Sequence, residues 1–355
     1  MEHKIVVIPG DGIGGEIVEA ALRVLQAAAN QSNISLSLQE YYAGGAALDR
    51  YEEPLPQETV QAAKQADAVL LGAVGGPQWD GVAPELRPER AILGLRQELG
   101  LYANLRPVRV IPSLASYSPV KEEVVSGVDI LIVRELNGGI YFGEKGTEGD
   151  KAWDVEMYSR PEIERIAEVA FQAAKGRHRQ VTSVDKANVL ASSRLWRATV
   201  MEAAKAHPDI SLNHYYVDNF AMQLILAPAQ FDVVVTNNLF GDILSDAAAV
   251  LAGSIGMLPS ASVGRETSLY EPIHGSAPEI AGQGIANPLG TILSAAMLLD
   301  YSLQKPEAAR AVEQAVEDVL AAGYRTQDIY RPGTTKVSTA EMGRLVEEKL
   351  NELAK

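Results

Sequence analysis

Short apolar runs alternate along the chain with longer stretches of helical periodicity. The runs are rich in valine, isoleucine and leucine and stop at glycine or polar residues, as buried strands do. They lie at 5–8, 68–71, 128–133 and 231–236, and another strand is expected to end at 182–186. Helices are predicted at 16–29, 89–99, 161–175, 193–206, 247–251, 289–303, 307–322 and 339–353. Strands that alternate with helices predict the α/β class.

One region departs from this alternation. Between residues 253 and 288, glycine and proline interrupt the chain and little periodicity remains. Long irregular stretches in compact enzymes are more often binding loops than disordered segments. We therefore expect a ligand-binding loop here.

Composition narrows the class of protein. The 355 residues suggest about two domains, and a 47% share of hydrophobic residues is ample for a core. The net charge of −15 argues against nucleic acid or an anionic membrane as partner, because both need a basic surface. The chain has no cysteine, which excludes disulfides and thiol catalysis, and no apolar run approaches the ~20 residues of a membrane span. A cytoplasmic enzyme is expected.

Two aspartates follow the apolar run at 231–236. Asp242 and Asp246 stand four residues apart, so on a helix both carboxylates share one face and repel unless a cation lies between them. Hard oxygen ligands suit Mg²⁺ or Mn²⁺. The spacing equally allows a plainer interpretation, in which Asp242 caps the helix that begins at a Gly241-Asp242 turn and Asp246 complements the helix dipole.

Three arginines lie beside apolar sequence rather than in charged runs. Arg96, Arg106 and Arg134 could pair bidentately with the two carboxylates of a small diacid. For any one arginine taken alone, a surface or salt-bridged position is the favoured interpretation.

The first strand leads into a glycine-rich turn. Gly10, Gly12 and Gly15 satisfy G-x-G-x-x-G, and Glu40 ends the next strand-like segment where a ribose-binding acid would stand. The fingerprint indicates either a Rossmann cofactor site or a tight strand-to-helix turn.

The segment 237–246, together with the opening Pro-Gly-Asp-Gly-Ile-Gly, closely resembles the signature of the isocitrate and isopropylmalate dehydrogenases. These are metal-dependent β-decarboxylating dehydrogenases. The resemblance implies a large mixed sheet and not a Rossmann fold, so that the glycine fingerprint is a decoy. It also implies two discontinuous domains, 1–101 with 254–355 on the cofactor side, and 102–253 with the metal ligands and a dimerisation arm after Gly143.

The same resemblance implies roles for further residues. Asp242, Asp246 and Asp218 of the partner subunit would hold the metal, and Lys186 with Tyr141 would form the acid–base pair. Arg96, Arg106 and Arg134 would bind the substrate carboxylates. Because Lys186 and Asp218 would reach into the other subunit, a homodimer with shared active sites is implied.

A loop and a glycine-rich turn resemble the family's cofactor site. The residues concerned are His274, Gly275, Ser276, Ala277, Pro278, Glu279, Ile280, Ala286 and Asn287 in the loop, and Gly75, Gly76 and Pro77 in the turn. An acid at position 279 can bind both ribose hydroxyls and repels a 2′-phosphate, which favours NAD over NADP. The family usually has aspartate there, so the longer glutamate leaves the tightness of binding open.

Substrate choice in the family depends on positions that here are Glu89, Ile92 and Leu93. Isocitrate dehydrogenases hold a third carboxylate near them with hydroxyl and amide groups, whereas Ile92 and Leu93 would leave that charge unpaired. The expected reaction is the NAD-dependent oxidative decarboxylation of an isopropylmalate. Isocitrate, homoisocitrate and tartrate are alternative substrates, and a non-catalytic dinucleotide-binding protein is the alternative from another class.

Overall fold

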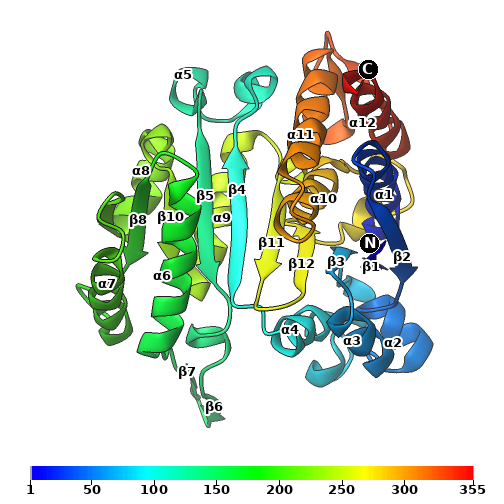
Figure 1. Ribbon diagram of the computed structural model, residues 1–355. Coiled ribbons are helices and arrows are strands. Elements are labelled where there is room, and N and C mark those ends of the chain that lie inside the picture. Colours follow the sequence, from blue (N-terminus) through cyan, green and yellow to red (C-terminus); the bar gives the residue numbers. More distant parts are fainter. Residues whose placement is uncertain (1, 355) are drawn as a thin grey trace. The chain divides into compact units, whose positions relative to one another are not determined.

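The computed structural model describes residues 2–354 and consists of two compact units (Figure 1). Unit 1 comprises Met1–Leu101 and Gly253–Lys355, and unit 2 comprises Tyr102–Ala252. The chain thus leaves unit 1 after Leu101 and returns to it at Gly253. No helix within residues 2–354 is both long and apolar enough to cross a membrane.

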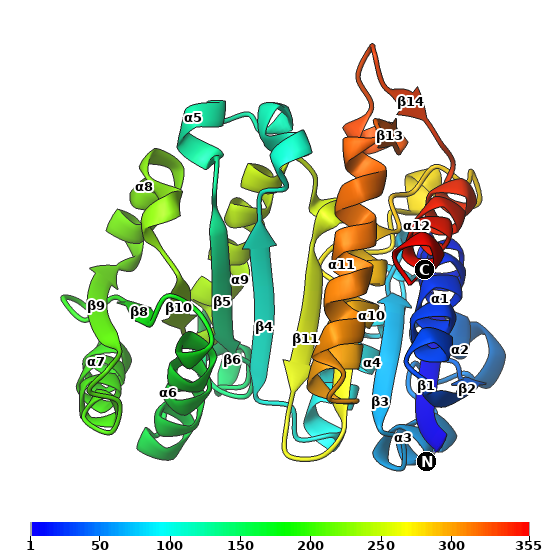
Figure 2. The ribbon, with the colours of Figure 1, turned by 45° about the horizontal axis from the view of Figure 1, so that its top comes forward.

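Five strands of unit 1 lie side by side in the order β2-β1-β3-β12-β11. They are β1 (Glu2–Gly10), β2 (Ser35–Glu40), β3 (Ala68–Ala73), β11 (Pro259–Val263) and β12 (Ser268–Pro272), parallel except for β11 against β12. The helices are α1 (Gly14–Gln31), α2 (Gly45–Tyr51), α3 (Gln57–Lys64), α4 (Glu89–Glu98), α10 (Leu289–Tyr301), α11 (Pro306–Ala321) and α12 (Thr339–Leu353). Helix α10 packs on β11 and β12, and α1, α11 and α12 pack beside it (Figure 2). Because α10 is apolar on nearly all sides, it lies in the middle of this layer. A small parallel pair, β13 (Tyr324–Arg325) and β14 (Thr335–Lys336), completes the unit.

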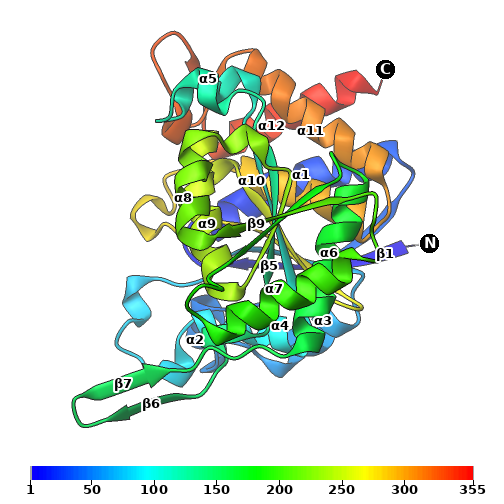
Figure 3. The same cartoon turned by 90° about the vertical axis from the view of Figure 1, so that its left-hand side faces the viewer.

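Five strands of unit 2 lie side by side in the order β4-β5-β10-β8-β9. They are β4 (Ala103–Arg109), β5 (Asp129–Glu135), β8 (Gln180–Asp185), β9 (Ser211–Tyr216) and β10 (Val233–Thr236), and only β4 is antiparallel to its neighbour. The helices are α5 (Glu122–Val125), α6 (Arg160–Lys175), α7 (Ala191–Ala204), α8 (Val217–Leu226) and α9 (Asn238–Ala249). Helices α6 and α7 cover one face of the strands, while α8 and α9 cover the other (Figure 3). The hairpin of β6 (Lys145–Glu148) and β7 (Lys151–Asp154) projects from this unit.

The expected α/β class with a mixed sheet is confirmed, but two local predictions were wrong. Helix α9 begins at Asn238 rather than after a Gly241-Asp242 turn, because the Asn237 side chain accepts a hydrogen bond from Phe240 N at 2.8 Å and caps the helix. Asp242 is therefore inside the helix and is not its cap. The region predicted to be irregular contains β11 and β12, which pair with each other, and β12 also pairs with β3, whose residues lie two hundred positions earlier in the chain.

The glycine turn after β1 is filled by the chain's own atoms. Asp11 is 4% exposed, and its carboxylate accepts the backbone N–H groups of Gly45, Ala46 and Gly75 at 2.8, 2.7 and 2.7 Å. Burial raises the pKa of Asp11 against these three hydrogen bonds. A Cβ on Gly12 would lie 2.1 Å from the Ser276 carbonyl oxygen, so the turn packs directly on backbone. The glycines at positions 10 and 12 thus serve close packing of backbone against backbone.

We expect the substitution Asp11→Ala to lower the free energy of unfolding by about 3 kcal/mol or more, because it leaves buried N–H groups without an acceptor. Urea unfolding followed by circular dichroism measures the change. The exposed Asp80 of the same unit offers a matched control, since D80A removes a carboxylate without uncovering a buried donor. Equal stability of the two variants would contradict this account.

Candidate active site

Helix α9 carries the two aspartates predicted to bind metal. It packs on β4 and β5, whose strand residues supply two arginines beneath it. Gly241 makes the close approach possible, because a Cβ there would lie 2.6 and 2.8 Å from the Cγ and Cβ atoms of Arg134. Asp242 and Asp246, one turn apart, both face this pair of arginines.

Arg134 and Arg106 neutralise the two carboxylates. Arg134, 2% exposed, donates through Nη1 to Asp242 Oδ1 and through Nη2 and Nε to Asn238 Oδ1 at 2.8 and 3.2 Å. Arg106, 7% exposed, lies 3.6 Å from Asp242 Oδ1 and 3.3 Å from Asp246 Oδ1, and donates to Ser245 Oγ at 2.6 Å. Two buried guanidinium groups are thus held in fixed positions beside two acids. Such groups can exchange these protein partners for a ligand carboxylate.

Tyr141 completes this group. Its hydroxyl donates to Asp242 Oδ2 at 2.9 Å, and its ring stands 5.8 Å from the Arg134 guanidinium. Burial, followed by the hydrogen bond to Asp242, raises the pKa of Tyr141, which therefore keeps its proton at neutral pH. Burial also raises the pKa of Asp246, with the nearby Asp242 adding to the effect and Arg106 opposing it. A proton donor and a pair of acids thus share one small region.

The turn that presents Tyr141 is fixed from two sides. Glu135, fully buried, accepts the backbone N–H groups of Asn137 and Gly138 at 2.9 and 2.7 Å. Asn238 Nδ2 donates to the carbonyl oxygens of Leu136 and Gly138 at 3.1 and 3.2 Å. Asn238 therefore joins Arg134 to the tyrosine turn. Sequence reasoning gave Asn238 and Glu135 no role, because both act through partners that only the fold brings near.

Lys186 and Asp218 form a second pair. Lys186 follows β8, Asp218 is the second residue of α8, and Lys186 Nζ donates to Asp218 Oδ1 at 2.6 Å. This hydrogen bond from Lys186 lowers the pKa of Asp218. Within residues 2–354 no group of three or more histidine and acidic side chains is arranged to hold a metal. One chain thus brings together Asp242 with Asp246, and separately Lys186 with Asp218.

The expected cofactor loop lies in unit 1 after β12. Ser276 O accepts the Ile13 N–H at 2.9 Å, and Ala277, Ile280 and Ala281 pack on the core of Ile13, Ile17 and Ala286. Asn287 accepts the Leu289 N–H at 3.0 Å and donates to Asp328 at 3.0 Å. Pro278 and Glu279 belong to a short 3-10 turn, Pro278–Ile280, and are exposed, as is Gly275. The loop is rigidly attached on one side and open on the other.

His274 carries a buried nitrogen that lacks a partner. Its Nδ1 lies 2.9 Å from the Gly275 carbonyl oxygen, while no hydrogen-bond partner for the buried Nε2 is found in the part of the chain that is described. Burial lowers the pKa of His274, so the ring is neutral. An unpaired buried polar atom is costly, and this nitrogen is available to hydrogen-bond with a ligand. The loop therefore fits a cofactor with polar groups.

Three further predicted substrate residues lie on α4 of unit 1. Glu89 is exposed, with Oε1 next to the glycine turn, where a Cβ on Gly75 would lie 2.9 Å from it. Ile92 and Leu93 are half-buried. Gly75 donates to Asp11, and Gly76 precedes the 3-10 turn Pro77–Trp79.

The third arginine of the predicted set also lies on α4. Arg96 pairs with Glu271 of β12 at 3.2 Å. The structure thus joins Arg106 and Arg134 around shared acids, and places Arg96 in unit 1 with an acid of its own.

Comparisons with known proteins agree with these features. A sequence model of the family described as isocitrate/isopropylmalate dehydrogenase matches residues 4–346. A protein of Clostridium acetobutylicum named 3-isopropylmalate dehydrogenase is 59% identical, covering 97% of this chain and 98% of its own length. Another of that name, from Moorella thermoacetica, is 58% identical and covers 99% of both chains.

Solved structures of proteins named as dehydrogenases are also similar to this chain. An isocitrate dehydrogenase from Methylococcus capsulatus superposes with a TM-score of 0.87 at 36% identity, covering 98% of this chain and 99% of its own. A β-decarboxylating dehydrogenase from Thermococcus kodakarensis gives 0.83 at 38% identity, covering 99% and 97%.

Proposed function

The chain belongs to the isocitrate/isopropylmalate dehydrogenase family, and we propose that it oxidatively decarboxylates (2R,3S)-3-isopropylmalate with NAD, giving 4-methyl-2-oxopentanoate and CO₂. The observation that carries the substrate assignment is the 56–59% identity, over nearly the whole chain, to proteins named 3-isopropylmalate dehydrogenase. The relative named isocitrate dehydrogenase is 36% identical. The product is the precursor of leucine, so the reaction belongs to leucine biosynthesis.

The arginines supply the substrate anchor. Arg106 in the middle of β4 and Arg134 near the end of β5 are buried, and each presents guanidinium N–H groups to acids that lie beside it. A dicarboxylate that binds here can accept bidentate hydrogen bonds from these guanidinium groups, which already contact protein carboxylates. Arg96 of α4 is the third proposed anchor, and Glu89, Ile92 and Leu93 of the same helix would face the substrate side chain. Their half-buried aliphatic surface suits an isopropyl group and leaves a third carboxylate without a partner.

The donor set fits a divalent metal. Asp242 and Asp246 offer hard carboxylate oxygens from one helix face, and the raised pKa of Asp246 reflects the burial and the nearby acid that a cation would compensate. Asp218 of the partner subunit is the proposed third ligand. When bound, Mg²⁺ or Mn²⁺ supplies positive charge that stabilises the negative oxygen developed during oxidation and decarboxylation, while NAD accepts the hydride.

Protein groups move the protons. Lys186, a single amine presented at the end of β8, takes the C2 hydroxyl proton as hydride leaves C2. The product of this oxidation is a β-keto acid, and it loses the carboxylate attached to C3 as CO₂. Tyr141 then gives its proton to C3, and its hydroxyl is protonated in the resting site because burial and Asp242 raise its pKa. The fixed turn below Tyr141 keeps this donor in place.

A homodimer accounts for the separated pairs of residues. On α8, Met222, Ile225 and Leu226 have exposed fractions of 55, 58 and 66%, and on the neighbouring α9 Ile243 is 60% exposed. Contiguous exposed apolar side chains on adjacent helices are typical of subunit interfaces. We infer that a second copy covers this face and brings its own Lys186 and Asp218 to the aspartates of α9. The dimer is proposed to act in the cytoplasm, where NAD is available.

Steady-state assays with each candidate acid test the substrate. We expect kcat/KM for 3-isopropylmalate to exceed that for isocitrate, homoisocitrate and tartrate by at least about tenfold, because a buried unpaired carboxylate costs several kcal/mol. A tenfold preference for any of the other three acids would overturn the assignment. Absence of turnover with all four would favour a dinucleotide-binding protein without catalysis.

The cofactor preference depends on Glu279. We expect Glu279→Ala to lower kcat/KM with NAD and to narrow the discrimination against NADP by about tenfold, because the carboxylate binds ribose hydroxyls and repels a 2′-phosphate. Glu307, exposed in the same unit, provides the charge-matched control E307A. If both variants keep the discrimination of the unmodified enzyme, Glu279 does not select the cofactor.

A further inference from the structure

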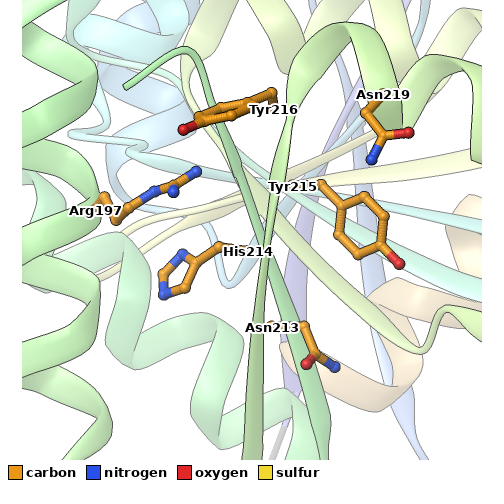
Figure 4. A pocket seen from close by; sticks show the side chains of 6 residues that line it. All are labelled: Arg197, Asn213, His214, Tyr215, Tyr216 and Asn219. Carbon is orange, nitrogen blue, oxygen red and sulfur yellow. The ribbon is translucent and has the colours of Figure 1, made fainter. Parts of the chain in front are cut away.

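Arg197 of α7 makes two contacts that no catalytic role requires. Its Nε and Nη2 atoms donate to Asp185 Oδ2 and Oδ1 at 2.8 and 2.9 Å, a bidentate pair with a carboxylate whose side chain is 1% exposed. Its guanidinium also lies 4.8 Å from the centre of the Tyr216 ring. Figure 4 shows Arg197 and Tyr216 at a pocket that Asn213, His214, Tyr215 and Asn219 also line.

These contacts join the ends of two neighbouring strands. Asp185 is the last residue of β8 and Tyr216 the last of β9, and the two are paired in register. Lys186 follows directly after Asp185, and Asp218 comes two residues after Tyr216. One guanidinium thus bridges the segments that carry both members of the Lys186–Asp218 pair.

The carboxylate of Asp185 extends this support to the turn after β8. Its Oδ1 atom also accepts the Ala187 N–H at 2.9 Å, while the Lys186 N–H donates to Ser193 Oγ at 3.1 Å. The backbone around Lys186 is therefore fixed, although the Lys186 and Asp218 side chains are 25 and 65% exposed. An exposed ion pair does little to fix its own geometry, so the precision of this pair depends on the elements beneath it.

We propose that Arg197 is a positioning residue that fixes Lys186 and Asp218 relative to each other. Arg197 does so through its ion pair with Asp185 and its contact with the Tyr216 ring. The inference rests on the proposed function, in which Lys186 is the base. Burial alone does not explain the arrangement, because a bidentate fork that also stacks on a ring defines the separation and angle of two strand ends.

The other end of unit 2 contains a matched arginine. Arg177 donates through Nε to Asp232 at 2.7 Å and through Nη2 to the Asp129 side chain at 2.8 Å. Asp129 begins β5, and Asp232 directly precedes β10. Because these strands run parallel to β8 and β9, Arg177 joins strand starts whereas Arg197 joins strand ends. Both arginines pair with a buried aspartate, but Arg177 contacts two acids and, within residues 2–354, no ring, and it lies at the opposite ends of the strands from Lys186.

The test compares Arg197→Lys with Arg177→Lys. Lysine keeps the charge beside each buried aspartate but loses the planar fork and the stacking. We expect R197K to lower kcat at least about tenfold with KM changed less than about threefold, since small misplacements of a catalytic group cost rate rather than binding. R177K should lose comparable stability in urea and keep its kcat. Tyr216→Leu leaves the buried ion pair intact and should lower kcat in the same way, which tests the proposal even if R197K folds poorly.

A second comparison uses the Lys186→Ala background. If Arg197 acts through the Lys186–Asp218 pair, R197K should slow the K186A variant much less than it slows the unmodified enzyme, because groups that act as a unit are non-additive. The proposal would be overturned if R197K lowered the kcat of K186A by as much as it lowers that of the unmodified enzyme. It would also be overturned if R197K and Y216L had the same kcat as R177K. The proposed function fails in a different way, through absence of isopropylmalate turnover in the unmodified enzyme or unaltered turnover by K186A.

Discussion

Replacing Asp242 by asparagine is expected to lower kcat/KM by about a thousandfold or more, the range reported when a group that stabilises transition-state charge is removed. Asp242 is the central acid of the site, since Arg134, Arg106 and Tyr141 all contact its carboxylate. Asparagine keeps the shape but removes the negative charge that would attract a cation. It also removes the carboxylate charge that Arg134 contacts.

Metal affinity gives a readout that does not depend on turnover. Mn²⁺ binding can be measured by isothermal titration calorimetry in the presence of substrate. D242N should lose the tight binding of Mn²⁺. The variant D209N is the control, because Asp209 belongs to an exposed ion pair with Arg179 at 3.3 Å whose contribution is small. Asp242 is not a metal ligand if D242N binds Mn²⁺ with the affinity of the unmodified enzyme, or if it keeps more than about one tenth of the kcat/KM of the unmodified enzyme.

Several of the site residues could be located from sequence because they terminate buried strands. The apolar run at 128–133 predicts that Arg134 stands at a strand end, and the run at 231–236 places the aspartate-bearing segment beside it once the strands are parallel. The start of α9 could not be located, because Asn237, Asn238 and Asp242 are all capping residue types and only the side-chain geometry shows that Asn237 caps. Local preference alone leaves such alternatives open.

Other features depend on partners far away in the chain. Strand β12 lies in a segment with weak local signal and forms because Ser268, Leu269 and Tyr270 pair with residues 68–70. The edge strand β9 has an exposed, mainly polar pattern and was not predicted. Asn238 joins Arg134 to the turn before Tyr141 across about a hundred residues of sequence, which no local pattern encodes. Pairing between distant strands and hydrogen bonds between distant side chains could not be predicted from local sequence patterns.

Mixed dimers provide the sharpest expected result for the shared active site. Homodimers of Lys186→Ala and of Asp242→Asn should each turn over at least about a hundredfold more slowly than the unmodified enzyme. A dimer with one subunit of each kind, isolated by two affinity tags, should recover about half of the unmodified activity. The K186A subunit keeps Asp242 and Asp246, and the D242N subunit lends it Lys186 and Asp218, so one of the two sites is complete.

The control pairs K186A with a subunit that carries both substitutions. This dimer has no complete site under any arrangement, so its activity should match that of the K186A homodimer. If Lys186 instead served the aspartates of its own chain, the K186A–D242N dimer would have one broken group in each site and would also stay inactive. Recovery therefore requires that the exposed Lys186–Asp218 pair of one chain meets the Asp242–Asp246 pair of the other. The exposed apolar side chains of α8 and α9 are the surfaces that we propose to meet in such a dimer.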